Sequence, residues 1–183
     1  MFSWSSVKNI IIPVNNVDLK TSNTLVEGTF HLMEKLDDNQ SLLLDRIKPI
    51  RDKYDFILID CPPSLGLINR NALACADSVL IPIQAEYYAL EGLAQLLTSI
   101  RFVQKMFNKN LTIEGIVLTM FDSRTKLSFE VMAEVKKYFN EKVYRTHIPR
   151  NIKISESPSH GLSIFDYDKG GAGAIAYEEL TRC

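Results

Sequence analysis

The 183-residue sequence lacks the features that mark secreted, membrane-spanning and metal-binding chains. It has only three cysteines, Cys61, Cys75 and Cys183, and no CxxC pair, so neither a disulfide framework nor a zinc site is expected. No apolar run approaches the about eighteen residues that a membrane span needs. The start "MFSWSSVKNIIIPV" has no basic segment leading into a long apolar run, so it is not expected to be a signal peptide.

An excess of one charge is also missing. The sequence holds 21 Lys and Arg against 22 Asp and Glu, which leaves a net charge of −1. No overall field therefore draws the chain to nucleic acid or to an acidic membrane, and any such contact must come from a local patch. With 46% hydrophobic residues, the composition suits one globular domain over residues 1–183.

Short apolar runs alternate with helical patterns along the chain. The runs lie at 9–14, 54–60, 78–83, 111–120 and 142–149. Helical spacing is found at 21–35, 40–53, 65–76, 87–107, 126–140 and 171–182, with a kink or break expected at Pro49. Runs that are apolar on both sides fit the buried strands of a parallel sheet. The alternation predicts an open, mostly parallel α/β sheet flanked by helices.

Ligands of such sheets bind beyond the carboxyl ends of the strands. Asp60 ends one run and precedes "CPPSLG", where a carboxylate can hold magnesium or can simply cap the next helix. Gln84, Glu86 and Tyr87 follow the next run. We expect them either to line a cleft or a dimer surface, or only to cap the following helix.

Basic residues gather after the last two runs. Arg124, Lys126, Arg150 and Lys153 form either a phosphate-contacting cluster or an ordinary solvated surface. His160 lies between Ser159 and Gly161, but no G-x-S-x-G elbow accompanies it, so a hydrogen-bonded loop residue is expected. His31 and His147 are isolated, and no metal-ligand spacing is present.

Longer stretches carry a family resemblance. "YDFILIDCPPSLGLINRNALACADSVLIPIQAEYYALEGLAQLL" resembles the central segment of the ParA/Soj chromosome- and plasmid-partition ATPases, which are deviant Walker A P-loop proteins. "GIVLTMFDSRTKLS", "VYRTHIPRNIKISESPSHGLSI" and "YDKGGAGAIAYEEL" continue the match in the same order. The resemblance covers about residues 10 to 181.

The resemblance implies a nucleotide site for ATP and Mg²⁺. Asp60 matches the Walker B aspartate, which would hold magnesium through water once nucleotide is bound. The residues that match the switch segment sensing the γ-phosphate are Cys61, Pro62, Pro63, Ser64 and Gly66. The residues on the side of the base are Pro149, Arg150 and Asn151 of "IPRN", together with Asp122.

The same resemblance implies macromolecular partners. Arg124 and Lys153 match positions that contribute to non-specific DNA binding by the ATP-bound dimer, and Lys153 stands where many relatives have Arg. A ParB/Spo0J-like partner protein, a homodimer or a heterodimer with a full-length relative, and a cytoplasmic, nucleoid-associated location without membrane contact are also implied.

Two motifs of the family are absent from these residues, the K-G-G-x-G-K-[ST] phosphate loop and the D-x-Q-x-N switch. Because "IIIPVNNVDL" resembles a segment beyond both, the chain is expected to correspond to the C-terminal two-thirds of a ParA protein and to have a P-loop NTPase-like fold without the family's first strand. Phosphate cradling carries most of phosphoryl-transfer catalysis, so the chain alone is expected to hydrolyse no ATP and to contain no catalytic residue. The alternative is a non-catalytic DNA- or partner-binding module that associates with a full-length ParA-like protein.

The run "DKGGAGAI" at 168–175 imitates a phosphate loop without matching it. Ala174 and Ile175 stand where a working loop has Lys and then Thr or Ser, and the preceding "SIFDYD" is short and acidic. Gly170 and Gly171 are therefore expected to form the turn before the last helix, with Ala174, Ala176 and Leu180 packing inward.

Overall fold

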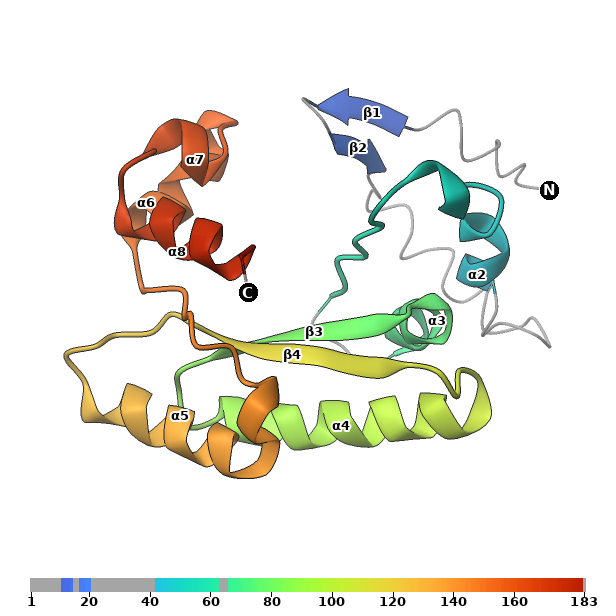
Figure 1. Cartoon of the computed structure of the whole chain (residues 1–183), viewed down its shortest axis with the longest axis horizontal. Coiled ribbons are helices and arrows are strands. Elements are labelled where there is room, and N and C mark those ends of the chain that lie inside the picture. Colours follow the sequence, from blue (N-terminus) through green and yellow to red (C-terminus); the bar gives the residue numbers. More distant parts are fainter. Residues whose placement is uncertain (1–10, 15–16, 21–41, 63–65, 183) are drawn as a thin grey trace. The chain divides into compact units, whose positions relative to one another are not determined.

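A computed structural model describes residues 11–14, 17–20, 42–62 and 66–182 of the chain (Figure 1). The chain divides into two compact units, Met1–Cys75 and Ala76–Cys183. The interpretation of residues 1–183 as one domain stays a prediction, and the helix expected at 21–35 lies outside the described residues.

The first unit combines a small hairpin with short helices. Strand β1 (Ile11–Val14) pairs antiparallel with β2 (Val17–Lys20), with Ile11 opposite Lys20. The first run of the sequence is thus a strand, but it belongs to a hairpin rather than to a parallel sheet. Helix α2 (Leu42–Ile47) contacts α3 (Leu67–Cys75), where the Leu43 amide donates to Asn71 Oδ1 at 3.3 Å.

The break expected at Pro49 is confirmed. Helix α2 ends at Ile47, and a single 3-10 turn (Arg51–Lys53) follows. The proline has no amide hydrogen to donate, and its ring disfavours helical backbone at the residue before it. The helical pattern read over 40–53 therefore becomes two short pieces.

The prediction of a strand at 54–60 is wrong for this structure. Residues 55–62 form neither helix nor strand, and the side chains of Phe56 and Leu58 are 86% and 93% exposed. A strand exists only through hydrogen bonds to a neighbour, and the two strands that the structure describes in this unit, β1 and β2, pair with each other. Within the described part of its unit, the apolar run has the composition of a strand but does not pair as one.

The second unit is built on a parallel sheet. Strand β3 (Ser78–Gln84) pairs in parallel with β4 (Thr112–Thr119), with Gln84 opposite Thr119. Helix α4 (Ala89–Met106) connects the two strands, as a parallel pair requires. Between Val79 and Leu80 the register shifts by one residue, which leaves Glu114 as an extra residue on β4.

The strand expected at 142–149 is reduced to two isolated parallel bridges, Ile116 with Val143 and Phe121 with Pro149. The Tyr144 amide donates to Ile116 O and the Ile148 amide donates to Leu118 O. From the first of these hydrogen bonds to the second, this segment moves on by four residues (Tyr144 to Ile148), whereas β4 moves on by only two (Ile116 to Leu118). The surplus residues bulge away from the ladder, which is why no continuous strand forms.

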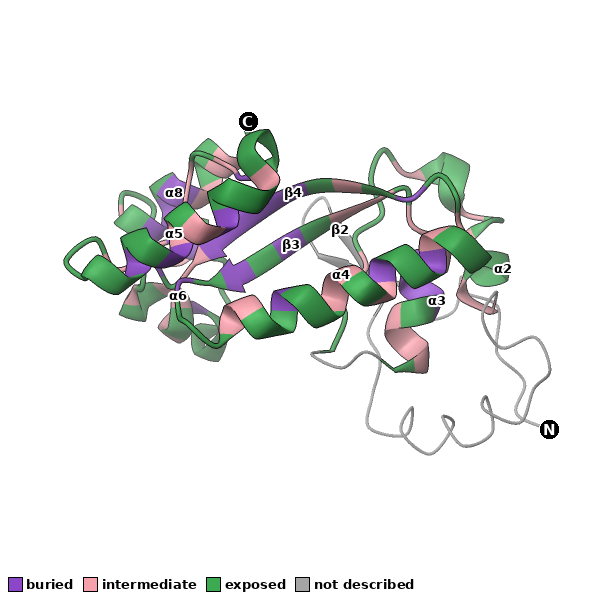
Figure 2. Ribbon diagram, turned by 90° about the horizontal axis from the view of Figure 1, so that it is seen from below, coloured by how far each residue is buried: buried purple, intermediate pink, exposed green. Residues whose placement is uncertain are grey.

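Helices cover both faces of this sheet within the second unit. Helix α4 and helix α5 (Lys126–Phe139) lie on one face (Figures 1 and 2). On β4, Ile116, Val117 and Leu118 are all buried, so both faces of this strand are covered, as its apolar run predicts. Val117 packs with Ile148 and Ala176 in a buried cluster, and the partly buried Leu180 packs against it.

Three short helices end the chain, α6 (Ile152–Glu156), α7 (Ile164–Tyr167) and α8 (Ala172–Leu180). Helices α6 and α7 were not predicted, because one or two turns are too short to show periodicity. The expected turn is confirmed: Gly171 is the residue before α8, and Ala174 and Ala176 are buried. The run "DKGGAGAI" is a helix entry.

Candidate functional site at the carboxyl edge of the sheet

Three segments end together at one edge of the second unit's sheet. Past the end of β3, the Ala85 amide donates to Thr119 O at 3.0 Å. Past the end of β4, the Phe121 amide donates to Ile148 O, and the Arg150 amide donates to Phe121 O, both at 3.0 Å. This pairing gathers the residues after each strand, which is where ligands of open α/β sheets bind.

A hollow of about 580 Å³ opens between the ends of β3 and β4. Tyr87 and Tyr88 line it from the first turn after β3, and Asp122 and Arg150 line it from the next two segments. Glu86 lines it too, and it accepts a hydrogen bond from Arg150 Nη2 at 2.7 Å. The geometry therefore favours the cleft alternative for Glu86 and Tyr87.

A second hollow of about 220 Å³ lies beside the end of β4. Pro149 and Asn151 line it together with Gln84 and Tyr177. The Asn151 carboxamide oxygen accepts from the Lys153 amide at 2.7 Å and so caps α6, which leaves its Nδ2 group as the donor. Of the four predicted base-side residues, Pro149 and Asn151 thus line this hollow, whereas Asp122 and Arg150 line the larger one.

Asp122 is held as a carboxylate at the entrance to α5. Arg124 Nε donates to Oδ1 at 2.9 Å and Arg124 Nη2 donates to Oδ2 at 2.8 Å, while the Arg124 amide donates to Oδ1 at 3.0 Å. These hydrogen bonds, above all those from the Arg124 side chain, lower the pKa of Asp122 to about 2. Thr125 then begins the helix, with Oγ1 accepting from the Ser128 amide at 3.4 Å.

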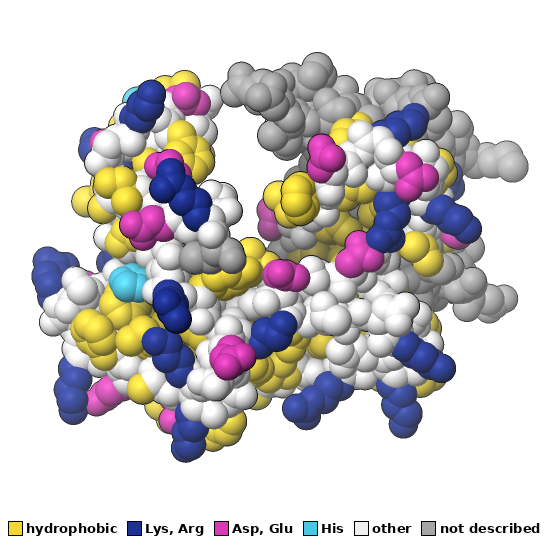
Figure 3. Space-filling view, viewed as in Figure 1, with side chains coloured by type: hydrophobic (Ala, Val, Ile, Leu, Met, Phe, Trp, Pro, Cys, Tyr) yellow, Lys and Arg dark blue, Asp and Glu magenta, His cyan; other side chains and the backbone are white. Residues whose placement is uncertain are grey.

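All four residues of the predicted basic cluster carry an intramolecular carboxylate partner. All four cations are exposed, whereas Asp122 is half-buried. The separations between nitrogen and oxygen are 2.8 Å for Arg124–Asp122, 2.9 Å for Lys126–Glu130, 2.7 Å for Arg150–Glu86 and 3.0 Å for Lys153–Glu156. Figure 3 shows that basic and acidic side chains also lie close together over the C-terminal helices. Exposed pairs of this kind are worth about 0–1 kcal/mol, so a phosphate can compete for the cations.

Glu156 contacts a residue of the predicted basic cluster, and the sequence analysis did not single it out. Its carboxylate accepts from Lys153 Nζ at 3.0 Å and from the Tyr167 hydroxyl at 3.1 Å. The hydrogen bond to Glu156 raises the pKa of Lys153, and the same contact lowers the pKa of Glu156. The i,i+3 spacing of Lys153 and Glu156 could have predicted their ion pair from the sequence. The contact with Tyr167 could not be predicted in this way, because Tyr167 lies on another helix.

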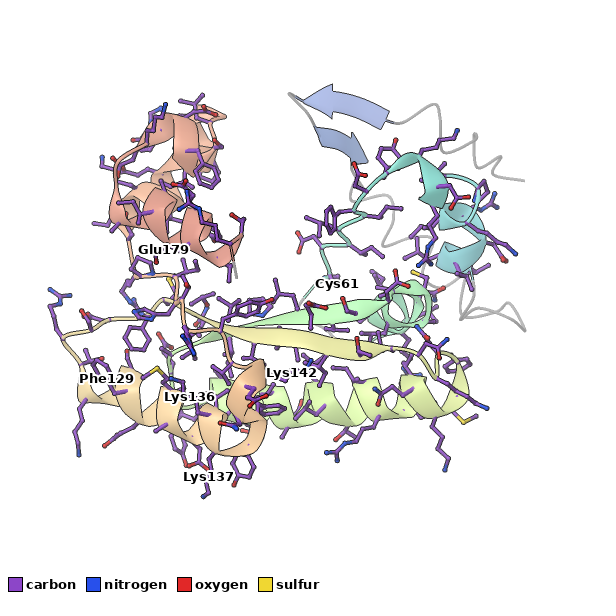
Figure 4. The ribbon with its side chains drawn as sticks, in the orientation of Figure 1. Cys61, Phe129, Lys136, Lys137, Lys142 and Glu179 are labelled. Carbon is purple, nitrogen blue, oxygen red and sulfur yellow. The ribbon has the colours of Figure 1, made fainter. Side chains whose placement is uncertain are left out.

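The predicted magnesium and switch residues lie in the first unit. Asp60 and Cys61 are exposed on the trace after Phe56, where Figure 4 labels Cys61. Although Cys61 is exposed to solvent, protein atoms around the thiol desolvate it in part, and this, with the Asp60 carboxylate second, raises the pKa of Cys61. Asn69 Nδ2 donates to Pro62 O at 3.0 Å, so α3 holds the end of this trace. Pro63 and Ser64 lie outside the described residues, and Gly66 directly precedes α3.

The two histidines that the structure describes, His147 and His160, each pack against an aromatic ring. His160 stacks on Tyr167 with ring centroids 4.9 Å apart, and His147 lies 4.1 Å from the ring of Phe121. His31 lies outside the described residues.

Within residues 42–62 and 66–182, no three His, Cys, Asp or Glu side chains are grouped to hold a metal ion. The helices found in this part of the chain include none long and apolar enough to cross a membrane.

Comparison with known proteins decides the family. A protein-family model described as an AAA domain matches residues 1–113. The sporulation initiation inhibitor protein Soj of Bacillus subtilis (strain 168) is 48% identical over 169 residues, which cover 92% of this chain and 67% of that protein. The chain belongs to the ParA/Soj family of partition ATPases. Another family member, the chromosome-partitioning ATPase Soj of Treponema pallidum (strain Nichols), is 49% identical over 93% of this chain and 67% of its own length.

The solved structures agree on the fold. The cobyrinic acid a,c-diamide synthase of Mycobacterium smegmatis, solved with bound ADP and magnesium, matches with a TM-score of 0.80 and 27% identity. The match covers 97% of this chain and 66% of that protein. The fold class read from the sequence, an α/β P-loop NTPase-like sheet flanked by helices, is therefore confirmed. This ParA/Soj chain spans about two thirds of the length of these relatives.

Proposed function

We propose that this chain acts in DNA partition by holding the base of an adenine nucleotide in the 220 Å³ hollow and contacting DNA through Arg124 and Lys153. The observation that carries the proposal is the convergence of Pro149, Asn151 and Gln84 at the carboxyl edge of the sheet. Apolar walls from Ile148 and Ile154 suit the faces of a base, and the amides of Asn151 and Gln84 suit its polar edge.

Asp60 would hold Mg²⁺ through the ion's water shell when nucleotide is bound. A single exposed carboxylate suits that role, because Mg²⁺ keeps several of its waters and is bound by one or two carboxylates together with phosphates. Since the 183 residues contain no K-G-G-x-G-K-[ST] run, the triphosphate gains little from this chain, and hydrolysis by the chain alone is not expected.

Binding of adenosine, ADP and Mg²⁺–ATP to the purified chain tests the base site. We expect weak binding of similar strength for all three ligands, because the base supplies the contacts. Asn151→Asp keeps the oxygen that caps α6 but removes the Nδ2 donor, so it is expected to weaken binding without loss of helix. Release of phosphate from Mg²⁺–ATP, or affinity that rises steeply with phosphate number, would contradict the proposal.

Charge reversal tests the DNA contact. The Arg124→Glu/Lys153→Glu double variant is expected to lose affinity for a non-specific duplex at low salt. Its matched control is Lys136→Glu/Lys142→Glu, which makes the same charge change at the end of α5 and in the turn that follows, where Figure 4 labels both residues. Equal losses in the two double variants would mean that net charge, and not this face, governs binding.

A second candidate function is a non-catalytic module that pairs with a full-length ParA-like protein and with a ParB/Spo0J-like partner. This function needs only surfaces within these 183 residues and no phosphate-loop sequence. Homodimerisation and a nucleoid-associated location belong to the same proposal. Sedimentation of the chain with and without a full-length relative separates self-association from mixed dimers.

A further inference from the structure

Glu156 contacts the proposed DNA-binding cation and is itself fixed in place. Its Oε2 atom accepts from Lys153 Nζ at 3.0 Å, one turn away on α6, and from the Tyr167 hydroxyl at 3.1 Å. The Tyr167 ring is held in turn by stacking on His160 and lies 5.4 Å from Lys153 Nζ. Lys153 therefore faces a carboxylate and an aromatic ring whose positions are set by two different helical segments.

This arrangement differs from an ordinary pair on one helix. In an isolated i,i+3 pair both side chains rotate freely, and holding them together costs side-chain entropy. Here the Tyr167 hydroxyl already orders the Glu156 carboxylate, so the ion pair with Lys153 forms at a smaller entropic cost. The Lys153 and Glu156 side chains are 52% and 40% exposed, which leaves both of them within reach of an approaching phosphate.

We propose that Glu156, positioned by Tyr167, competes with nucleic-acid phosphate for Lys153 and thereby sets a low affinity of this face for DNA. The inference rests on the proposed DNA contact of Arg124 and Lys153 and adds the residue that limits it. Glu156 acts in two ways, by neutralising the cation and by repelling the phosphate.

The salt dependence of binding follows from the same competition. A cation that neutralises a DNA phosphate releases condensed counterions, and each full contact adds about 0.9 to the salt slope of a duplex. A lysine whose charge is already balanced by Glu156 contributes less than a full contact. Removing the carboxylate charge should therefore tighten binding and also steepen its dependence on salt.

The test uses an isosteric variant of the whole chain. Glu156→Gln removes the charge and keeps an oxygen that accepts from Tyr167, so the fold is expected to survive, as circular dichroism will check. Binding to a non-specific duplex at low salt should tighten about two- to fivefold, the range that corresponds to an exposed ion pair. Tyr167→Phe keeps the charge but releases the carboxylate, and a smaller tightening is expected.

Glu134→Gln is the matched control. It removes the same charge from an i,i+3 pair on α5, where Lys137 lies 3.8 Å from Glu134. Its affinity for DNA should equal that of the unaltered chain.

Three outcomes would overturn the inference. If Glu156→Gln binds DNA like the unaltered chain while Lys153→Glu loses binding, competition by Glu156 is wrong and the proposed DNA contact stands. If Glu134→Gln tightens binding equally, net charge explains the effect and the role of Glu156 is wrong. If neither charge reversal at Arg124 and Lys153 nor Glu156→Gln changes binding, the DNA contact and the inference fail together.

Discussion

The guanidinium of Arg124 contacts the carboxylate of Asp122 at two points, with Nε 2.9 Å from Oδ1 and Nη2 2.8 Å from Oδ2. The contact orders the loop between β4 and α5 and places a fixed negative charge at the hollow beside Arg150. Arg124, which the resemblance assigns to DNA binding, is thus hydrogen-bonded to Asp122, which the resemblance places on the side of the nucleotide base.

The first prediction concerns the protonation of Asp122. The pKa of this group is lowered to about 2 in the folded chain, below its usual value of 3.8. A depressed folded pKa means that the contribution of Asp122 to stability is complete above pH 3.8 and is lost as the pH falls through about 2. Carboxyl NMR should show a midpoint near 2 for Asp122, and Arg124→Ala should raise it. A midpoint unaffected by Arg124→Ala would contradict the contact.

The second prediction compares two helical glycines. A Cβ at Gly173 would lie 2.6 Å from Ile154 Cγ1, so Gly173→Ala should destabilise the chain by about 1–3 kcal/mol through overpacking. Gly92 lies on α4 with nothing within 4 Å, so Gly92→Ala should stabilise by about 0.5–1 kcal/mol. Urea unfolding measures both changes. Effects of the same sign would show that the packing around α8 differs from this structure.

The third prediction tests whether the run at 54–60 is exposed, as in this structure, rather than buried as a strand of a sheet. Leu58 is 93% exposed, so Leu58→Ser should change the free energy of unfolding by no more than about 0.5 kcal/mol. Leu118 is 1% exposed on β4, and Leu118→Ala should cost about 2–5 kcal/mol. Denaturant titration compares the two variants. A cost for Leu58→Ser near that of Leu118→Ala would mean that this run is buried.

The fourth prediction concerns the thiol of Cys61. Its raised pKa predicts that the thiol is alkylated slowly near neutral pH and faster as the pH rises, because the thiolate is the nucleophile. Asp60→Asn removes the smaller of the two causes and should speed alkylation modestly. Mass spectrometry of the Cys61 peptide measures the rate. Fast alkylation at neutral pH in the unaltered chain would contradict the prediction.

The amino-acid sequence by itself determined the elements that local periodicity encodes. Helices α4, α5 and α8 lie within the predicted ranges, the break at Pro49 follows from proline chemistry, and the apolar run at 111–120 contains β4. The same local reading excluded "DKGGAGAI" as a phosphate loop, because a loop needs specific residues after the last glycine.

Only the tertiary structure decided where partners are found. The run at 54–60 has the residues of a strand, but strand formation depends on a neighbour that sequence periodicity does not describe. Residues 143–149 run beside β4 yet bulge out of register, which reflects backbone geometry rather than composition. The basic cluster was readable as four cations, but the Arg150–Glu86 pair spans 64 positions and Tyr167 reaches Glu156 from another helix. Charge in sequence is additive, whereas charge on a surface depends on which side chains the fold brings within hydrogen-bonding distance.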